Sequence, residues 1–346
     1  MKANRIMKDK KMLILLSFAS LVAFTVINLS IGAVKVDFMD IIKIIMEKIG
    51  VMPFQTDISD ATKYIILDVR LPRIIASYFV GGTLAISGAA YQGLLKNPMA
   101  DPYILGISSG AAFGATISIV FFGGIKILGI ASINLTAFIG AILVVFIVYN
   151  IARIGSDVPI TTLLLSGIAM SQFLAALMSV MMLMFGESLH IIIHWTMGSL
   201  SGKGWDKVLS LIPYSLLGLA VLMYLSRDMD LMLLGDENAN NLGVNSERVK
   251  KVILLTTSII TGAAVAISGI IGFVGLIVPH AVRIFTGPRH KILLPVSFNA
   301  GGILLMFCDT LARSLITQEI PVGIVTAILG GPFFIFLLHK KKREVF

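Results

Sequence analysis

The chain has 346 residues, of which 57% are hydrophobic and 14% are charged, and its formal net charge is +9. An average soluble domain has about 25% charged residues, so this composition excludes an ordinary soluble enzyme or nucleic-acid-binding domain, and we attribute the positive charge to orientation in a membrane. The single cysteine, Cys308, excludes a disulfide framework and a multi-cysteine metal site, and we expect it to pack in an apolar run.

Long uncharged runs follow one another from the N-terminus to the C-terminus. The first follows a basic segment; it is too long for a typical signal-peptide core and no small-residue cleavage site ends it, so we predict a transmembrane helix there. Most runs reach the roughly 20 residues that a bilayer-spanning helix needs. The runs are 12–34, 74–95, 102–125, 127–152, 158–186, 208–226, 252–282, 292–308 and 320–339. They predict an all-α, polytopic membrane protein with a single transmembrane domain over 1–346.

The segment 33–69 separates the first two runs, and we predict that it is external and amphipathic. Within it, Asp40, Lys43 and Glu47 share one face of a helix, with isoleucines opposite. That pattern is typical of a helix lying at the membrane interface. A solvated amphipathic loop is the alternative.

Residues 70–110 combine sequence features that a helix in a soluble core does not need. Arg-Leu-Pro-Arg begins the segment, and Pro72 favours a helix start at this point. A charge-free helix rich in small residues follows and breaks at Asn97-Pro98 and Asp101-Pro102. Small residues at spacings of three or four favour close helix packing. They form two clusters, Gly81, Ala85 and Gly88 in the first and Gly106, Gly110 and Gly114 in the second.

The run 252–282 is too long for one span and too short for two full ones. Its glycines and Pro279 favour a split into helices at 252–269 and about 273–286, which brings the total to about ten spans. An even number agrees with the basic residues at both termini, because positive charge favours the cytoplasmic side. We therefore predict a cell-membrane protein with both termini in the cytoplasm.

A short repeat lies within the chain. GGTLAISG at 81–88 resembles GAAVAISG at 262–269, and the same offset aligns Pro98 with Pro279. In the ten-span topology the two copies run in opposite directions, which is typical of the inverted repeats of transporters. Coincidence is the alternative, since such strings are common in glycine-rich membrane helices.

The loop 226–250 is the longest on the predicted cytoplasmic side. Asp236 and Glu237 follow Gly235, which suits a short helix with acidic residues at its positive N-terminal end. Gly243 then offers a helix stop, because glycine accepts the left-handed backbone. A solvated connector fits the same composition.

The sequence has no phosphate-binding P-loop, so we expect no ATP hydrolysis by this chain alone. The nearest approach, 198–204, is too short and lacks the Ser or Thr that would hold magnesium. We interpret it as a plain external loop.

Seven ordered motifs resemble the FecCD-type permeases, the membrane subunits of ABC importers for iron–siderophore complexes, haem and vitamin B12. They are RLPR at 70–73, SGAAYQGLLKNPMADPYILGISSGAAFG at 87–114, WTMGSLSGKGW at 195–205, LLGDENANNLGV at 233–244, GFVGLIVPHAVR at 272–283, DTLAR at 309–313 and EIPVGIVTAILGGPFF at 319–334. GPRHK at 287–291 departs from the family, which tends to have an acidic residue before the histidine.

The resemblance implies a homodimer of ten-helix subunits in the lipid bilayer, two cytoplasmic ABC ATPase subunits and an extracytoplasmic substrate-binding protein. It also implies roles for particular residues. ATPase coupling would involve Gly235, Asp236, Glu237, Ala239, Leu242 and Gly243; binding-protein docking would involve Arg70, Arg73 and Arg313; a pathway gate would involve Thr161 and Thr162. The alternative is that the arginines anchor helix ends in the lipid headgroup layer, or that Arg313 pairs with Asp309 one turn earlier.

We therefore predict a permease that translocates an iron chelate (siderophore or haem) or vitamin B12 inward, driven by ATP hydrolysis on its partners. A stand-alone secondary transporter or channel is the alternative. Proton-coupled transporters usually need ionisable groups near the bilayer midplane, whereas Asp309, Arg313 and Glu319 cluster toward the outer helix ends. We expect no cofactor and no metal site, and we expect His190, His194 and His280 to bond at helix ends.

Overall fold

The chain folds almost entirely into helices. The computed structural model describes residues 17, 20–32, 36–50, 58–123, 125–127, 130–155, 158–315 and 318–344. The basic residues before residue 17 lie outside the described residues, as do the side chains of the basic residues at the C-terminal end. In the described part, β1 (Lys126–Ile127) pairs with β2 (Ile130–Ala131) in a two-residue antiparallel ladder.

The helices follow the predicted runs closely. They are Ser20–Ser30, α2 (Phe38–Ile49), α3 (Asp60–Tyr64), the π-helical turn η1 (Ile65–Arg70), α4 (Leu71–Leu94), the 3-10 turn η2 (Pro102–Leu105), α5 (Ile107–Phe121), α6 (Ser132–Ala152), α7 (Ile160–Met184), the 3-10 turn η3 (Gly186–Ser188), α8 (Leu189–Thr196), α9 (Trp205–Tyr224), α10 (Ser226–Met232), α11 (Asp236–Asn241), α12 (Ser246–Ser268), α13 (Val274–Thr286), α14 (His290–Ser314) and α15 (Val322–Glu344).

Six helices in the described residues are long and apolar enough to span a membrane. They are Asp60–Leu94, Ser132–Ala152, Ile160–Met184, Trp205–Tyr224, Ser246–Ser268 and His290–Ser314. Four shorter apolar helices accompany them: Ser20–Ser30, Ile107–Phe121, Val274–Thr286 and Val322–Phe336. The chain is therefore a multi-pass helical membrane protein.

The long run 252–282 is split where the sequence predicts. α12 ends at Ser268 and α13 begins at Val274. Gly269 and Phe273 flank the break with φ angles of 71° and 70°. Left-handed backbone interrupts a helix, and a phenylalanine in this conformation is uncommon.

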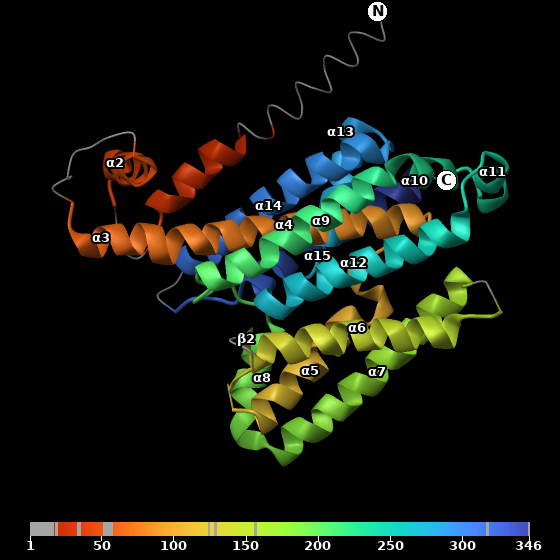
Figure 1. Ribbon diagram of the computed structural model, residues 1–346, viewed down its shortest axis with the longest axis horizontal. Helices are drawn as coiled ribbons and strands as arrows, with labels where there is room; N and C mark the ends of the chain where they lie inside the picture. The colour runs from red at the N-terminus through yellow and green to blue at the C-terminus, as the bar shows by residue number, and fades with distance from the viewer. Residues whose placement is uncertain are drawn as a thin grey trace, which may run out of the picture.

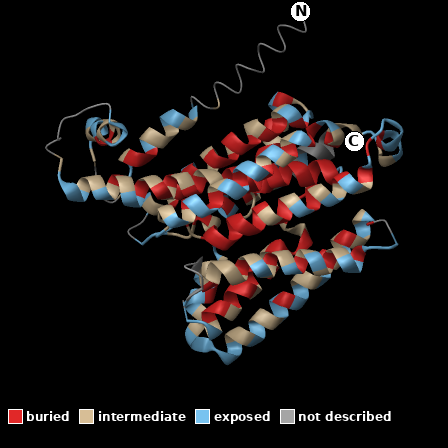
Figure 2. Cartoon of the chain, in the orientation of Figure 1, coloured by how far each residue is buried: buried red, intermediate tan, exposed pale blue. Residues whose placement is uncertain are grey.

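α4 lies at the centre of the bundle. It packs against α9, α12, α13 and α14, and 83% of its most apolar window is buried. Figure 2 shows the buried residues concentrated on this group of helices. A second group, α5 to α8, lies beside α12 in Figure 1 and joins the first through contacts of α6 with α12.

Small residues allow α4 to approach its neighbours at backbone distance. A Cβ at Gly81 would overlap the carbonyl of Gly301, and a Cβ at Gly88 would overlap that of Gly275. Gly110 of α5 meets the backbone of α6 in the same way at Gly140. The glycine clusters therefore act in helix packing, as the sequence predicts.

Gly88→Ala is expected to destabilise the protein by about 1–3 kcal/mol, because the added methyl must displace the backbone of α13. The free energy of unfolding in mixed detergent micelles measures this effect. Gly331→Ala is the matched control, since its Cβ would meet nothing within 4 Å. Equal stability of the two variants would contradict the close approach of α4 and α13.

The predicted helix start at Pro72 is wrong, because the helix already begins at Asp60 and runs without a break to Leu94. A π-helical turn accommodates the proline: the N–H of Leu71 donates to the carbonyl of Ile66, five residues earlier. Pro72 itself has no N–H to donate. The wider turn lets the helix pass through the proline, so the arginines on either side lie within a continuous helix.

Within the amphipathic segment, residues Phe38–Ile49 form the helix α2. The Asp37 side chain accepts from the N–H of Met39, and Gly50 ends the helix in left-handed backbone. Ile41 and Ile44 are buried in a cluster with Leu29, Ile66, Ile74 and Met306. The isoleucine face therefore packs on the protein's own helices.

α4 and α12 run in opposite directions along the bundle (Figure 1). α2 and α3 lie at one end of the molecule, and α10 and α11 lie at the other. Candidate sites are found at both ends.

Candidate functional site

The two short helices α10 and α11 lie at the end of the molecule opposite α2 and α3 (Figure 1). The backbone of Gly235 separates them with a φ of 112°, and α11 starts directly after it with Asp236 and Glu237 in its first turn. Gly243 follows the helix with a φ of 87°. The predicted helix start and stop are therefore confirmed, and each uses a glycine where another residue would be strained.

Asp236 fastens α11 to two transmembrane helices. Its carboxylate lies 3.0 Å from Nζ of Lys96, just after α4, and 2.6 Å from Nζ of Lys250 on α12. Partial burial alone would raise the pKa of Asp236, but the hydrogen bonds from Lys250 and Lys96 outweigh it and lower the pKa. Lys250 also pairs with Glu247 at 2.7 Å. This network ties the projecting helix to the bundle.

The residues expected to contact a partner at this end divide into two groups. Leu242, which directly follows α11, is 58% exposed, and Glu237 in the first turn of α11 is exposed as well. Ala239 is fully buried, so it cannot contact a partner directly, because the periodicity of a six-residue helix turns it toward the protein's own core. Leu234, which the sequence prediction missed, is 61% exposed just before Gly235.

A buried histidine joins α10 to the bundle. His290, at the start of α14, is fully buried, and its Nδ1 lies 2.7 Å from Oδ1 of Asp230 on α10. The backbone N–H of His290 donates to the same oxygen at 2.9 Å. Gly93 leaves room for the ring, since its Cβ would lie 2.5 Å from Nε2. Sequence reasoning noted the unusual GPRHK segment but not this pairing, which depends on residues 60 positions apart.

Asp230→Ala is expected to lower the free energy of unfolding by about 1–3 kcal/mol, because it leaves buried donors of His290 without an acceptor. Chemical unfolding in mixed micelles tests this. Asp228→Ala on the same helix is the control, and we expect it to stay within about 0.5 kcal/mol of the wild type. If Asp230→Ala were as stable as the control, the Asp230–His290 pair would not be what holds α10 against α14.

At the opposite end, Arg73 binds two carboxylates. Its guanidinium donates to both oxygens of Asp309 at 2.9–3.1 Å and to both oxygens of Glu319 at 2.9 and 3.0 Å. The side chain of Asp309 is 2% exposed, whereas that of Glu319 is 45% exposed. The cluster joins α4, α14 and the link before α15.

The other two arginines of the predicted docking set contact the helix Ser20–Ser30. Nη1 of Arg70 donates to the carbonyl of Leu29 at 2.7 Å, and Arg70 is only 5% exposed. Nη2 of Arg313 donates to the carbonyl of Asn28, also at 2.7 Å. Both therefore bond carbonyls near the end of a helix within the same chain.

Thr161 and Thr162 lie in the first turn of α7, where Thr161 is exposed and Thr162 is half-buried. Only 22% of the most apolar window of α7 is buried. Large apolar side chains are exposed along its length: Leu165, Ile168, Phe173, Val180 and Leu183. The threonines are thus placed on a helix whose surface is free for lipid or another subunit.

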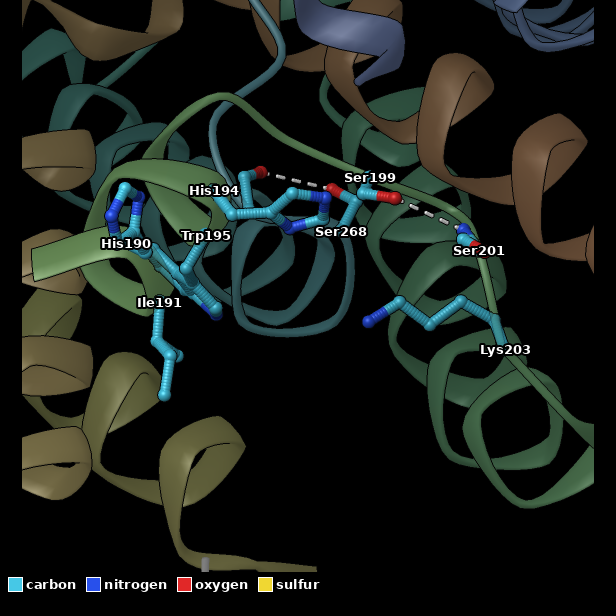
Figure 3. Close-up of a pocket in the computed structure, with 9 residues that line it drawn as sticks. His190, Ile191, His194, Trp195, Ser199, Ser201, Lys203 and Ser268 are labelled. Carbon is cyan, nitrogen blue, oxygen red and sulfur yellow. Dashed lines mark hydrogen bonds between the residues drawn. The ribbon is translucent and has the colours of Figure 1, made fainter. Parts of the chain in front are cut away.

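A cavity of about 410 Å³ opens at the same end as the Arg73 cluster, between α8, the link 197–204 and the end of α12. His190, His194 and Trp195 of α8 form one side (Figure 3). Ser199, Ser201 and Lys203 of the link form another, and Ser268 closes it from α12. The segment 198–204, expected to be a plain loop, therefore lines a cavity.

Backbone contacts hold this cavity in shape. The N–H of Ser199 donates to the carbonyl of Ser268 at 2.7 Å, and the N–H of Ser201 donates to Oγ of Ser199 at 3.1 Å. A Cβ at Gly269 would overlap the carbonyl of Trp195. The link 197–204 therefore packs against the chain where α12 ends, before α13 begins.

In the described part of the chain, no group of three or more His, Cys, Asp or Glu residues could hold a metal ion. His190 and His194 line the cavity instead, and among the described residues no hydrogen bond joins either ring to a helix end. Cys308 is buried in α14, where it packs as expected.

Long apolar helices packed through glycine contacts, with short polar helices at one end and a polar cavity at the other, define a membrane permease. The chain belongs to the FecCD transport family, whose model matches residues 20–340.

Relatives agree with this assignment. The chain is 44% identical over 290 residues to the cobalamin import system permease protein BtuC of Halobacterium salinarum, covering 84% of this chain and 77% of the relative. It is 35% identical to the Fe(3+)-citrate import system permease protein YfmE of Bacillus subtilis, covering 99% of both. A solved structure assigned to the metal-chelate type of ABC transporter, in an inward-facing conformation, superposes with a TM-score of 0.82 at 32% identity, covering 94% of this chain and 98% of that one.

Proposed function

We propose that this chain is the membrane-spanning subunit of an ABC importer that moves a metal chelate or corrinoid inward. The family match over residues 20–340 supports this most directly. In this proposal two copies of the chain form a homodimer, two ATPase subunits bind on the cytoplasmic side, and a substrate-binding protein delivers the substrate from outside.

The α10–α11 end is the proposed contact with the ATPase. Leu234 and Leu242 are large apolar side chains exposed on a short polar segment, which is typical of a docking surface. The Asp236 network and the Asp230–His290 pair connect the two short helices to α4, α12 and α14. A shift of the short helices would therefore act on the core of the bundle.

The proposed topology has ten spans with both termini in the cytoplasm. Six long and four shorter apolar helices in the described residues agree with that number. The opposite directions of α4 and α12 agree with an inverted repeat that pairs residues 81–88 with 262–269. Labelling of single cysteines in intact cells, in a Cys308→Ala background, would locate each loop.

The translocation pathway is proposed to lie between two copies of the chain, beside α7 and α15. The exposed apolar length of α7 supports a neighbour on this helix, and Thr161 and Thr162 would lie at its cytoplasmic gate.

Docking of the binding protein is proposed at the outer end around Arg73. Glu319 is the more exposed member of its cluster and adds a carboxylate to the surface. Arg70 and Arg313 would support this surface through their bonds to the helix Ser20–Ser30.

Reconstitution tests the function. The chain is placed in liposomes with an ABC ATPase subunit and a substrate-binding protein from the same organism, and uptake of ferric chelates and cobalamin is measured with and without ATP. Uptake that needs ATP and both partners supports the proposal. Uptake by the chain alone without ATP would instead support a secondary transporter or channel.

A further inference from the structure

Lys203 brings a positive charge into the cavity, and no ion-pair partner for it is found among the described residues. Its side chain extends from the link toward α8, where His190, His194 and Trp195 line the opposite side (Figure 3). The nearest acidic side chain along the chain, Asp206, pairs instead with Lys207 at 3.4 Å. Among the described residues, no acceptor within ion-pair distance of Lys203 is found. A partly buried ammonium group without a partner is costly, so this site suits a ligand that provides the missing charge.

The other polar groups of the cavity can complete an anion site. Ser199 carries a hydroxyl group, and His190 and His194 lie one helical turn apart on α8. The hydroxyl of Ser268 already donates to the carbonyl of Ala264 at 2.9 Å and that of Ser201 to Glu319, so these two serines shape the cavity and do not serve as donors to a ligand. Hydroxyl and imidazole N–H groups donate hydrogen bonds to carboxylate oxygens. Trp195 adds an aromatic surface for an apolar part of the same ligand.

We propose that this cavity is an outer binding site for the anionic groups of the transported chelate, with Lys203 as the residue that recognises the charge. The inference rests on the proposed function and narrows the substrate class to chelates with carboxylate groups outside the metal shell. The volume of about 410 Å³ lies within the range of about 300–1,000 Å³ that is usual for small-molecule sites.

The electrostatics of the cavity agree with this assignment. The pKa of Lys203 is lowered to about 8, mainly by burial and to a smaller extent by the charge of Lys207, while the charge of Asp206 acts in the opposite direction. The lysine is still mainly protonated at pH 7, and a bound anion would favour that form.

Tryptophan fluorescence provides a direct test in the full-length protein. The chain has two tryptophans, so Trp205→Phe leaves Trp195, in the cavity wall, as the single reporter. Ferric citrate is the anionic probe and ferrichrome, a neutral trihydroxamate chelate, is the comparison. We expect saturable quenching by ferric citrate, and Lys203→Gln should weaken its apparent affinity at least five-fold without changing any response to ferrichrome.

Lys207→Gln is the matched control, because it removes the same charge from a lysine that lines a neighbouring pocket. We expect it to change the ferric citrate affinity less than two-fold. Absence of saturable quenching by ferric citrate, or an equal effect of the two substitutions, would overturn the anion site. ATP-dependent uptake in the reconstituted importer is measured separately, so loss of the anion site leaves the proposed function standing, whereas no ATP-dependent uptake of any chelate would reject the function itself.

A pH series separates the charge of Lys203 from those of the groups around it, which are His190, His194, Asp206, Lys207 and Glu319, whose carboxylate bonds Ser201 of the cavity wall. Since deprotonation near pH 8 removes the recognised charge, ferric citrate binding should weaken as the pH rises from 7 to 9. Lys203→Arg keeps its charge over this range, so its binding should stay constant. Parallel pH profiles of the wild type and Lys203→Arg would contradict the role of Lys203.

Discussion

Asp309→Ala is expected to lower the free energy of unfolding by about 3–5 kcal/mol, because it leaves the buried guanidinium of Arg73 without its main counter-charge. Three hydrogen bonds of 2.9–3.1 Å join the two side chains, and Asp309 is almost fully buried. SDS titration in mixed micelles, followed by circular dichroism, measures the loss.

Glu319→Gln is the control in the same cluster. Its carboxylate also binds Arg73, but it is 45% exposed, so solvent screens the pair and we expect a loss of at most about 1 kcal/mol. If Asp309→Ala were no more damaging than Glu319→Gln, the buried pair would not be what holds α4 to α14.

Leu242→Asp is expected to weaken binding of the ATPase subunit by roughly 30-fold, since an apolar anchor at the centre of an interface contributes about 2 kcal/mol or more. Leu242 is 58% exposed in this chain, so the substitution should leave the fold intact. Affinity between the detergent-solubilised chain and its ATPase, measured by surface plasmon resonance, gives the change.

Leu242→Met keeps the apolar contact and should bind the ATPase as the wild type does. A melting temperature equal to that of the wild type for both variants excludes unfolding as the cause. ATPase binding by Leu242→Asp at wild-type affinity would show that the docking surface lies elsewhere on the chain.

Features that depend on nearby residues could be predicted from the sequence. Uncharged runs located the apolar helices, because a span needs a continuous apolar segment that shows directly in the sequence. The break of 252–282, the helix start after Gly235 and the stop at Gly243 were also predictable, since each follows from the backbone freedom of a glycine close by.

Predictions that required knowledge of side-chain direction were less successful. Pro72 indicated a helix start, but a π-helical turn carries the helix through it, and such turns have no reliable local signal. Ala239 was expected at a partner interface, yet it faces the core. Arg70 was expected at a surface, and its bond to Leu29 depends on a helix 41 residues earlier.

The sequence by itself determined the class of this protein: a multi-pass membrane permease of the FecCD family with short polar helices at one end. Only the tertiary structure decided which polar groups meet. The pairs Arg73–Asp309, Asp230–His290 and Asp236–Lys96 join residues far apart in the chain, and the cavity around Lys203 is formed by three separate segments. Apolar length is a local property, whereas a binding site depends on long-range packing, because its groups act only at contact distance.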